Sequence, residues 1–324
     1  TRAVMSLFMS ASHAKTVKMI DAVGQRKFNF VGARRYALTI SAILIVLGIA
    51  VFGSRGKNNF GIDFNGGTIV QRQFTEAVDA GDLRAALGEA GLGKAVIQQF
   101  DAGKGVMIKI PLATGEAETN VLDAIDAALS NTFGNRMLDP MIAGSIDYVG
   151  PVVGEQLKRE ALKAILFALI GILIYTSMRF ELKFGVAAIL ALVHDVLFTL
   201  GALAITGREI NLPVVAAILT IVGYSLNDTI VIFDRIREDL KLMRKSEFAE
   251  IVNASINQTL ARTLLTSGTT LFVVAALFAL GGEVINDFAF TLLVGVVVGT
   301  YSSIFVASPV LLAWSHGKRL KVRG

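Results

Sequence analysis

One apolar stretch, Leu212 to Phe233 (LPVVAAILTIVGYSLNDTIVIF), decides how the rest of the chain can be understood. A helix needs about 20 residues to cross the hydrocarbon core of a bilayer, and this stretch is long enough. It nevertheless carries a carboxylic acid, Asp228, about five residues or roughly 8 Å from its centre. Five more apolar stretches lie near residues 36–52, 161–178, 184–206, 263–280 and 288–314. The sequence therefore predicts a polytopic α-helical membrane protein with six spans and an acid inside span four.

The overall composition also indicates that lipid is the solvent for much of the chain. Hydrophobic residues make up 53% of the sequence and charged residues 18%, whereas ordinary globular domains carry about 25% charged residues. The chain has no cysteine and only 3 histidines. This excludes disulfides, iron–sulfur clusters and thiol chemistry, and it leaves no evident zinc cluster. We therefore expect no metal site.

The distribution of basic residues predicts the orientation of the spans. Lysine and arginine gather before span one, after spans two and four, and in the C-terminal tail, whereas the short loops after spans three and five carry few. By the positive-inside rule both termini are cytoplasmic, and the long segment after span one lies outside. The predicted parts are an N-terminal tail (1–35), span one (36–53), the outside domain (54–156), a bundle of spans two to six (157–314) with a cytoplasmic connector (235–260), and a C-terminal tail (315–324).

The segment between the first two spans shows alternating and amphipathic patterns instead of continuous apolar runs. A strand-like stretch, Thr68 to Phe74, precedes a helical stretch that begins at the N-cap Asp79 and stops at Gly91. The next elements are strands over 95–100 and 106–110, a helix over 116–133 and an extended stretch over 141–149. The order βαββαβ predicts an inserted α+β domain of the ferredoxin-like type. That fold alone identifies no function.

Asp228 is the strongest candidate for a functional residue. A carboxylate at membrane depth costs about 2.5 to 3.5 kcal/mol, so its presence needs a reason. Tyr224 and Ser225 share its helical face by their i−4 and i−3 spacing. The competing explanation is a simple hydrogen bond to a neighbouring helix, but a neutral Asn or Ser would make that bond at lower cost. We expect Asp228 to bind and release a proton.

Span three carries His194 and Asp195 near its middle. Neighbours on a helix point about 100° apart, so we expect these two side chains not to face one site. Asp195 shares a face with Thr199 and is placed to join the same polar cluster as Asp228. For His194, a satisfied hydrogen bond between helices and a role as a proton relay are equally open.

Span five begins with Arg262, which is followed by a stripe of Thr266, Thr269 and Thr270 at helical spacing. Such a stripe is typical of a hydrogen-bonding face rather than a lipid face. A long Arg262 side chain could reach Asp228, although snorkelling to the interface is the competing explanation. Desolvation favours a protonated acid and a nearby cation favours the carboxylate, so a mobile Arg262 would switch Asp228 between holding and releasing a proton.

Glycines mark two further features. Gly295 and Gly299 form a GxxxG pattern in span six, which indicates close packing against a neighbouring helix. Gly150, Pro151 and Gly154 lie between the outside domain and span two, where a plain linker and a hinge are equally open.

Several motifs now point to a known family. They are residues 61–68 (GIDFNGGT), 149–154 (VGPVVG), 194–195 (HD), 223–228 (GYSLND), 234–238 (DRIRE), 258–263 (QTLART), 266–270 (TSGTT) and 299–303 (GTYSS). In their order and spacing from Phe60 to Ala307, they resemble the SecD/SecF family of the bacterial protein-export machinery, and its SecF side in particular. The resemblance places the chain in the RND-type superfamily, in which one six-span bundle pairs with a second.

The resemblance also implies a function and partners. It implies a subunit of the cytoplasmic (inner) membrane that pairs with SecD, associates with the SecYEG channel and uses the proton gradient to promote export of preproteins driven by SecA. YajC and YidC are further candidate partners, and protons are the coupling ion without any cofactor. The implied proton-coupling residues are Asp228, its partner Arg262, Asp195, Asn227 and Thr266. The implied family motif of the outside domain is Gly61, Asp63, Gly66 and Gly67.

Two other functions are alternatives. One is half of an RND-type proton-driven exporter of small molecules or lipids, which the architecture alone permits but the motifs disfavour. The other is an intramembrane aspartyl protease that uses Asp195 and Asp228. Such proteases have Tyr-Asp and Gly-x-Gly-Asp sequences, whereas these aspartates follow His194 and Asn227.

Overall fold

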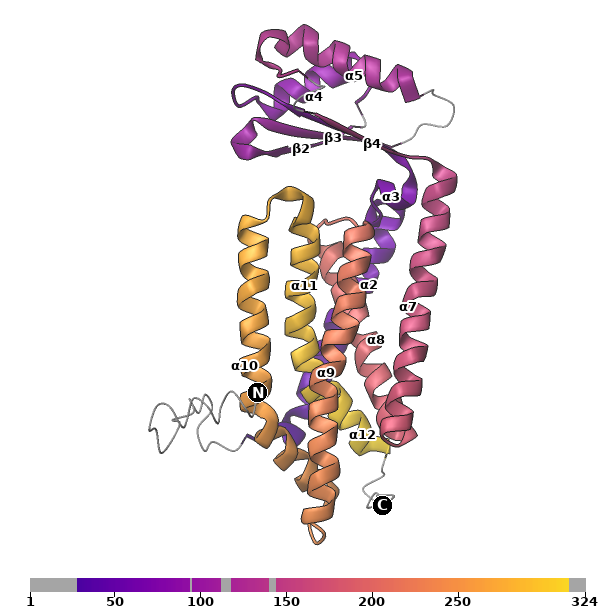
Figure 1. Cartoon of the computed structure of the whole chain (residues 1–324), viewed down its shortest axis with the longest axis vertical. Coiled ribbons are helices and arrows are strands. Elements are labelled where there is room, and N and C mark those ends of the chain that lie inside the picture. The colour runs from indigo at the N-terminus through magenta and orange to yellow at the C-terminus, as the bar shows by residue number, and fades with distance from the viewer. Residues whose placement is uncertain (1–27, 94, 112–117, 140–143, 315–324) are drawn as a thin grey trace, which may run out of the picture.

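The computed structural model describes residues 28–93, 95–111, 118–139 and 144–314. Most of the predicted N-terminal tail and all of the predicted C-terminal tail lie outside these residues. Within them, a helical bundle carries a small α/β domain at one end (Figure 1).

The bundle contains six helices long and apolar enough to cross a membrane, in agreement with the predicted spans. They are α2 (Phe30–Arg55), α7 (Pro151–Arg179), α8 (Leu182–Ile205), α9 (Leu212–Leu242), α10 (Phe248–Leu280) and a sixth span formed by α11 (Glu283–Ser302), the π-helical turn η4 (Ser303–Ala307) and α12 (Ser308–Trp314). The prediction of a multi-pass membrane protein is confirmed. α8, α9 and the sixth span are the most buried, whereas α2, α7 and α10 lie at the periphery.

The predicted connector over 235–260 is helical for most of its length. α9 continues to Leu242 and α10 begins at Phe248, so the two helices form a hairpin that extends past the apolar stretches. Asp239 fixes this hairpin from a buried position. It pairs with Arg235 at 3.0 Å and accepts a hydrogen bond from the Ser255 hydroxyl at 2.8 Å.

The inserted domain has the predicted ferredoxin-like topology. Its elements are β1 (Gly67–Gln73), α4 (Ala80–Glu89), β2 (Val96–Phe100), β3 (Gly105–Pro111), α5 (Glu118–Phe133) and β4 (Ser145–Val149). The sheet has the order β2-β3-β1-β4, and every neighbouring pair is antiparallel. Both helices cover the face turned away from the bundle, so the other face of the sheet is directed toward the membrane part (Figure 1).

The domain forms its own core between the sheet and its two helices. Val70 and Ile108 face each other across β1 and β3 and pack against apolar side chains of α4 and α5. Arg72 lies among them with 1% of its side chain exposed. Its guanidinium donates two hydrogen bonds of 2.9 Å to the carboxylate of Asp126 on α5, which compensates the buried charge.

Two connections tie the domain to the bundle. The first runs from α2 through a 3₁₀ turn, η1 (Gly56–Asn59), and a single helical turn, α3 (Ile62–Asn65), into β1. The second is short, because only Gly150 separates β4 from α7. Gly154 is confined, since a Cβ at that position would lie 3.0 Å from the carbonyl oxygen of Phe64.

Glycines allow the closest helix contacts of the bundle. A Cβ at Gly48 of α2 would lie 2.6 Å from the Cα of Gly201 of α8. In the sixth span, Gly299 packs in the same way against Ser225 of α9, and Gly295 packs against Ile221. The predicted packing role of the GxxxG pattern is therefore confirmed.

Replacement of Gly48 by valine should separate α2 from α8. We expect a loss of about 1 to 3 kcal/mol in stability, because neither backbone can move away without disturbing the bundle. The measurement is the midpoint of thermal aggregation in detergent. Gly53→Val is the matched control, since a Cβ at Gly53 on the same helix would meet nothing within 4 Å. Equal midpoints for the two variants would contradict the proposed contact.

Candidate functional site

Two buried carboxylates lie within the central helices of the bundle. Asp195 of α8 is 1% exposed and Asp228 of α9 is 2% exposed. Each is held by its own set of side chains, and within the described ranges no hydrogen bond joins one set to the other. The same part of the chain holds no group of three or more His, Asp and Glu side chains placed to bind a metal ion.

Asp195 is surrounded by hydrogen-bond donors. Its Oδ2 accepts from the hydroxyls of Ser225 on α9, at 2.5 Å, and Ser302 on α11, at 2.8 Å. Its Oδ1 lies 3.0 Å from Nδ1 of His194. An ionised Asp195 would only accept hydrogen bonds, with Nδ1 of His194 as the donor, and Nε2 of the same imidazole contacts the Ser41 hydroxyl of α2. The network connects four helices at mid-depth.

The expectation that His194 and Asp195 do not face one site was wrong. The helical angle of about 100° between neighbours does not keep these side chains apart, because Nδ1 of His194 and Oδ1 of Asp195 lie 3.0 Å from each other. The imidazole also stacks on Tyr301, with ring centroids 6.2 Å apart. Of the two explanations left open for His194, the structure shows the hydrogen bond between helices. Thr199 contributes only by donating to the backbone oxygen of Asp195.

Asp228 has far fewer partners. The Ser267 hydroxyl of α10 donates to its Oδ2 at 3.2 Å, and Thr300 of α11 donates to that hydroxyl at 2.7 Å. Two buried hydroxyl oxygens, those of Tyr224 and Thr263, have no hydrogen-bond partner among the residues described. Tyr224 lies one helical turn before Asp228 on α9, and Thr263 lies one turn before Ser267 on α10. Both helices therefore carry a polar atom with unused hydrogen-bonding capacity near the acid.

Arg262 is exposed at the surface of α10 and forms no ion pair with Asp228 within the part of the chain described. It is still close enough to act on the carboxylate electrostatically. The structure thus shows the arginine near the acid but not in contact with it.

Two other predicted site residues do not join the cluster. Asn227 is exposed on α9, about 100° around the helix from the buried Asp228. Thr266 is exposed as well, and its hydroxyl donates to carbonyl oxygens of its own helix, those of Arg262 and Thr263. Together with the exposed Thr269, it forms a polar stripe on the outer face of α10.

The residues that complete the two networks were not predicted as site residues. They are Ser41, Ser225, Ser267, Thr300 and Ser302. Four of them occur inside the motifs quoted from the sequence, so the signal was a hydroxyl at an otherwise apolar helical position. Their partners belong to other helices, and spacing along one helix does not reveal these.

The glycine-rich motif at the start of the inserted domain has a structural role. Gly61 donates its N–H to the carbonyl oxygen of Ile210, and Asp63 accepts from the N–H of Leu212 at 2.7 Å, which caps the start of α9. Gly66 and Gly67 have φ of 76° and 149°, values that favour glycine. The motif therefore attaches the domain to the loop between α8 and α9.

Comparison with known proteins identifies the family. The family described as "Protein export membrane protein SecD/SecF, C-terminal" matches residues 127–317. The protein translocase subunit SecF of Desulfurispirillum indicum is 49% identical over 290 residues, which cover 88% of this chain and 91% of the relative. SecF of Magnetococcus marinus is 44% identical over 320 residues, with coverage of 98% and 97%.

The fold leads to the same family. The crystal structure of SecDF from Thermus thermophilus, described as a translocon-associated membrane protein, matches with a TM-score of 0.83 and 40% identity. The match covers 97% of this chain and 42% of the SecDF chain. A crystal structure of SecDF in a super-membrane-facing form matches with a TM-score of 0.70, also at 40% identity. The chain therefore belongs to the SecD/SecF family of protein-export membrane proteins, and within that family it is a relative of SecF.

Proposed function

We propose that this chain is the SecF-type subunit of the Sec protein translocase and that it uses protons moving through Asp228 to promote export of preproteins. In this proposal it lies in the cytoplasmic membrane with both termini inside and the ferredoxin-like domain, residues 54–156, outside. The relatives named protein translocase subunit SecF support the translocase role. The surroundings of Asp228 support its role in proton exchange.

The contrast between the two buried carboxylates carries the proposal. Asp195 has hydrogen-bond donors on both oxygens and is therefore held in one place. Asp228 has one long hydrogen bond, from Ser267, and a cation nearby that does not touch it. An acid with few fixed partners inside the membrane can change its protonation state with little rearrangement of its neighbours. Asp228 is thus the residue of the pair suited to proton exchange.

The partners of Asp228 explain how its protonation would be coupled to movement of α10 relative to α9. The carboxylate on α9 attracts Arg262 of α10, whereas the protonated acid does not, so each protonation state favours a different position of α10 relative to α9. A proton that crosses the membrane releases about 2.3 kcal/mol per 100 mV, which is enough to shift a two-state equilibrium several-fold or more. Asn227 and Thr266 are proposed to join the site only when α10 moves.

SecD is the proposed partner, and the outer face of α10 is its proposed contact. The polar stripe there exposes Arg262, Thr266 and Thr269, and the charge of Arg262 would be costly to leave in lipid. This chain covers only 42% of the SecDF chain that it resembles, so the remainder of that chain offers a model for the partner. SecYEG, preproteins driven by SecA, YajC and YidC are proposed partners on the family resemblance alone.

Asp228→Asn should abolish the stimulation of export by the proton gradient. Asparagine keeps an acceptor for Ser267 but cannot exchange a proton. The measurement is gradient-dependent export of a preprotein in membrane vesicles. Glu238→Gln makes the same chemical change on an exposed side chain of α9 and should export normally. Full stimulation in Asp228→Asn would refute the proposed function.

Arg262→Met should also lose gradient-dependent export, while Arg262→Lys should keep a substantial part, because the proposal requires a cation at this position rather than a particular hydrogen bond. The same vesicle assay applies. Arg244→Met, in the exposed hairpin between α9 and α10, is the control. Normal export by the methionine variant would remove Arg262 from the mechanism.

Asp195→Ala should lower the stability of the protein, in addition to any effect on proton coupling. It leaves the donors of His194, Ser225 and Ser302 without an acceptor, at a cost of about 3 kcal/mol. We expect a lower midpoint of thermal aggregation than for Asp228→Ala, which leaves only Ser267 without its acceptor. If the two variants were equally stable, the assignment of Asp195 to a fixed structural network would be wrong.

A further inference from the structure

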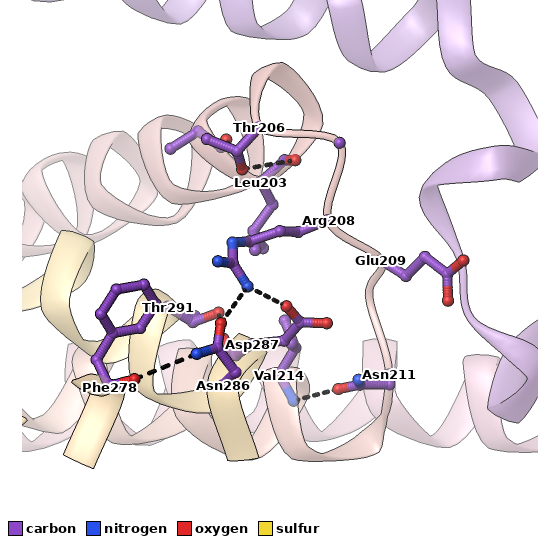
Figure 2. Close-up of polar contacts among 12 residues, drawn as sticks. Leu203, Thr206, Arg208, Glu209, Asn211, Val214, Phe278, Asn286, Asp287 and Thr291 are labelled. Carbon is purple, nitrogen blue, oxygen red and sulfur yellow. Dashed lines mark hydrogen bonds and ion pairs between the residues drawn. The ribbon is translucent and has the colours of Figure 1, made fainter. Parts of the chain in front are cut away.

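The loop between α8 and α9, Thr206 to Asn211, holds the outer domain and the bundle together (Figure 2). α8 ends at Ile205 and α9 begins at Leu212, so the loop joins the two helices that carry Asp195 and Asp228. Three sets of contacts connect it to the rest of the molecule.

The first set connects the loop to the segment that leads from α2 into the domain. The N–H of Ile210 donates to the carbonyl oxygen of Asn59 at 2.7 Å, and the N–H of Gly61 donates to the carbonyl oxygen of Ile210 at 2.8 Å. Phe60 and Ile210 thereby form a short parallel bridge. The buried side chain of Phe64 packs against Ile210 and apolar residues of α8 and α9. This attachment is firm, because it combines backbone hydrogen bonds with apolar burial.

The second set connects the loop to the sixth span. The guanidinium of Arg208 donates to the side-chain oxygen of Asn286 at 2.8 Å and forms an ion pair with Asp287, as Figure 2 shows. It also lies over the ring of Phe290, 4.4 Å from the centroid. These contacts fix the loop to the start of α11, the helix that supplies Ser302 to Asp195 and Thr300 to Ser267.

The third set is a single ion pair between the loop and the sheet. Nζ of Lys109 on β3 lies 3.0 Å from Oε2 of Glu209, and the two side chains are 14% and 28% exposed. In the described ranges it is the only ion pair that joins a strand of the sheet to the bundle. Around it lies a cavity of about 960 Å³, lined by the uncovered face of the sheet and by the outer ends of the helices. The sheet therefore has room to tilt, and Lys109 limits that tilt.

These contacts place the loop at the ends of two rigid helices, α8 and α9. Asp228 lies about 24 Å along α9 from Leu212, and Asp195 lies about 15 Å along α8 from Ile205, at 1.5 Å per residue. A displacement of α9 relative to α8 at the depth of the carboxylates must therefore appear at the loop, because helices transmit such movements as rigid bodies. Glu209 would carry the displacement to Lys109.

We infer that Glu209 and Lys109 are positioning residues that couple the proton site to the orientation of the outer domain through the α8–α9 loop. The inference rests on the proposed function, since it concerns how protonation at Asp228 reaches the domain. It places the coupling in this loop rather than at the linker Gly150-Pro151. Only Gly150 lies between β4 and α7 there, because Pro151 is already the first residue of α7.

A charge swap tests the pair in the full chain assembled with its partner in membrane vesicles. Lys109→Glu and Glu209→Lys should each lower gradient-dependent export by roughly threefold or more, and the double variant Lys109→Glu/Glu209→Lys should restore it. Arg159→Glu reverses an exposed charge on α7, within a local pair with Glu155, and should have no effect. A double variant no more active than the single ones would overturn the inference.

A crosslink tests the direction of coupling. Cysteines at positions 109 and 209, joined by a bifunctional maleimide in this cysteine-free chain, should suppress gradient-dependent export, and the crosslinking yield should differ between the chain with Asp228 and the Asp228→Asn variant. Normal export by the crosslinked protein, or equal yields, would overturn the coupling role. If Asp228→Asn abolishes export while the Lys109 and Glu209 variants export normally, the coupling fails and the proposed function stands. If Asp228→Asn exports normally, both fail.

Discussion

Hydrogen bonds to Asp195 hold the centre of the bundle together. A carboxylate at this depth requires compensation, and the chain provides it with hydroxyls from α9 and α11 and with an imidazole from α8 that is itself bound to α2. Small residues allow this arrangement, because Gly299 and Gly201 let the neighbouring helices approach closely enough for short side chains to meet. α10 takes no part in this network and joins the neighbouring one only through Ser267. Asp228, the acid proposed to exchange a proton, contacts that helix.

The same three helices are joined again at the ends nearest the inserted domain. There the α8–α9 loop contacts the start of α11 through Arg208 and the outer domain through Ile210 and Glu209. The bundle therefore has two sets of contacts between helices along its axis. One is the Asp195 network, and the other is formed by the α8–α9 loop. Asp228 lies farther from the domain than Ser225, which contacts Asp195, so both sets of contacts lie between Asp228 and the domain.

The spans and the topology of the inserted domain could be predicted because they depend on local patterns. Apolar length identifies a membrane helix, and alternation with turn residues identifies the strands and helices from β1 to β4. The site was predictable only in part. Asp228 and Asp195 stand out as acids in apolar surroundings, but the donors that distinguish a fixed acid from a free one come from other helices. For that reason His194 was expected to point away from Asp195, and Ser302 went unnoticed.

The polar stripe on α10 has a consequence for the life of the protein in the cell. The exposed hydroxyls of the stripe are already bonded to carbonyl oxygens of α10, so it is the guanidinium of Arg262 that is costly to leave in lipid unless another polypeptide covers it. A chain synthesised in excess of its partner would expose that guanidinium to lipid, and surveillance proteases of the membrane could distinguish such an orphan from an assembled subunit. Matched synthesis of the two halves, or their fusion into one gene, would remove that hazard.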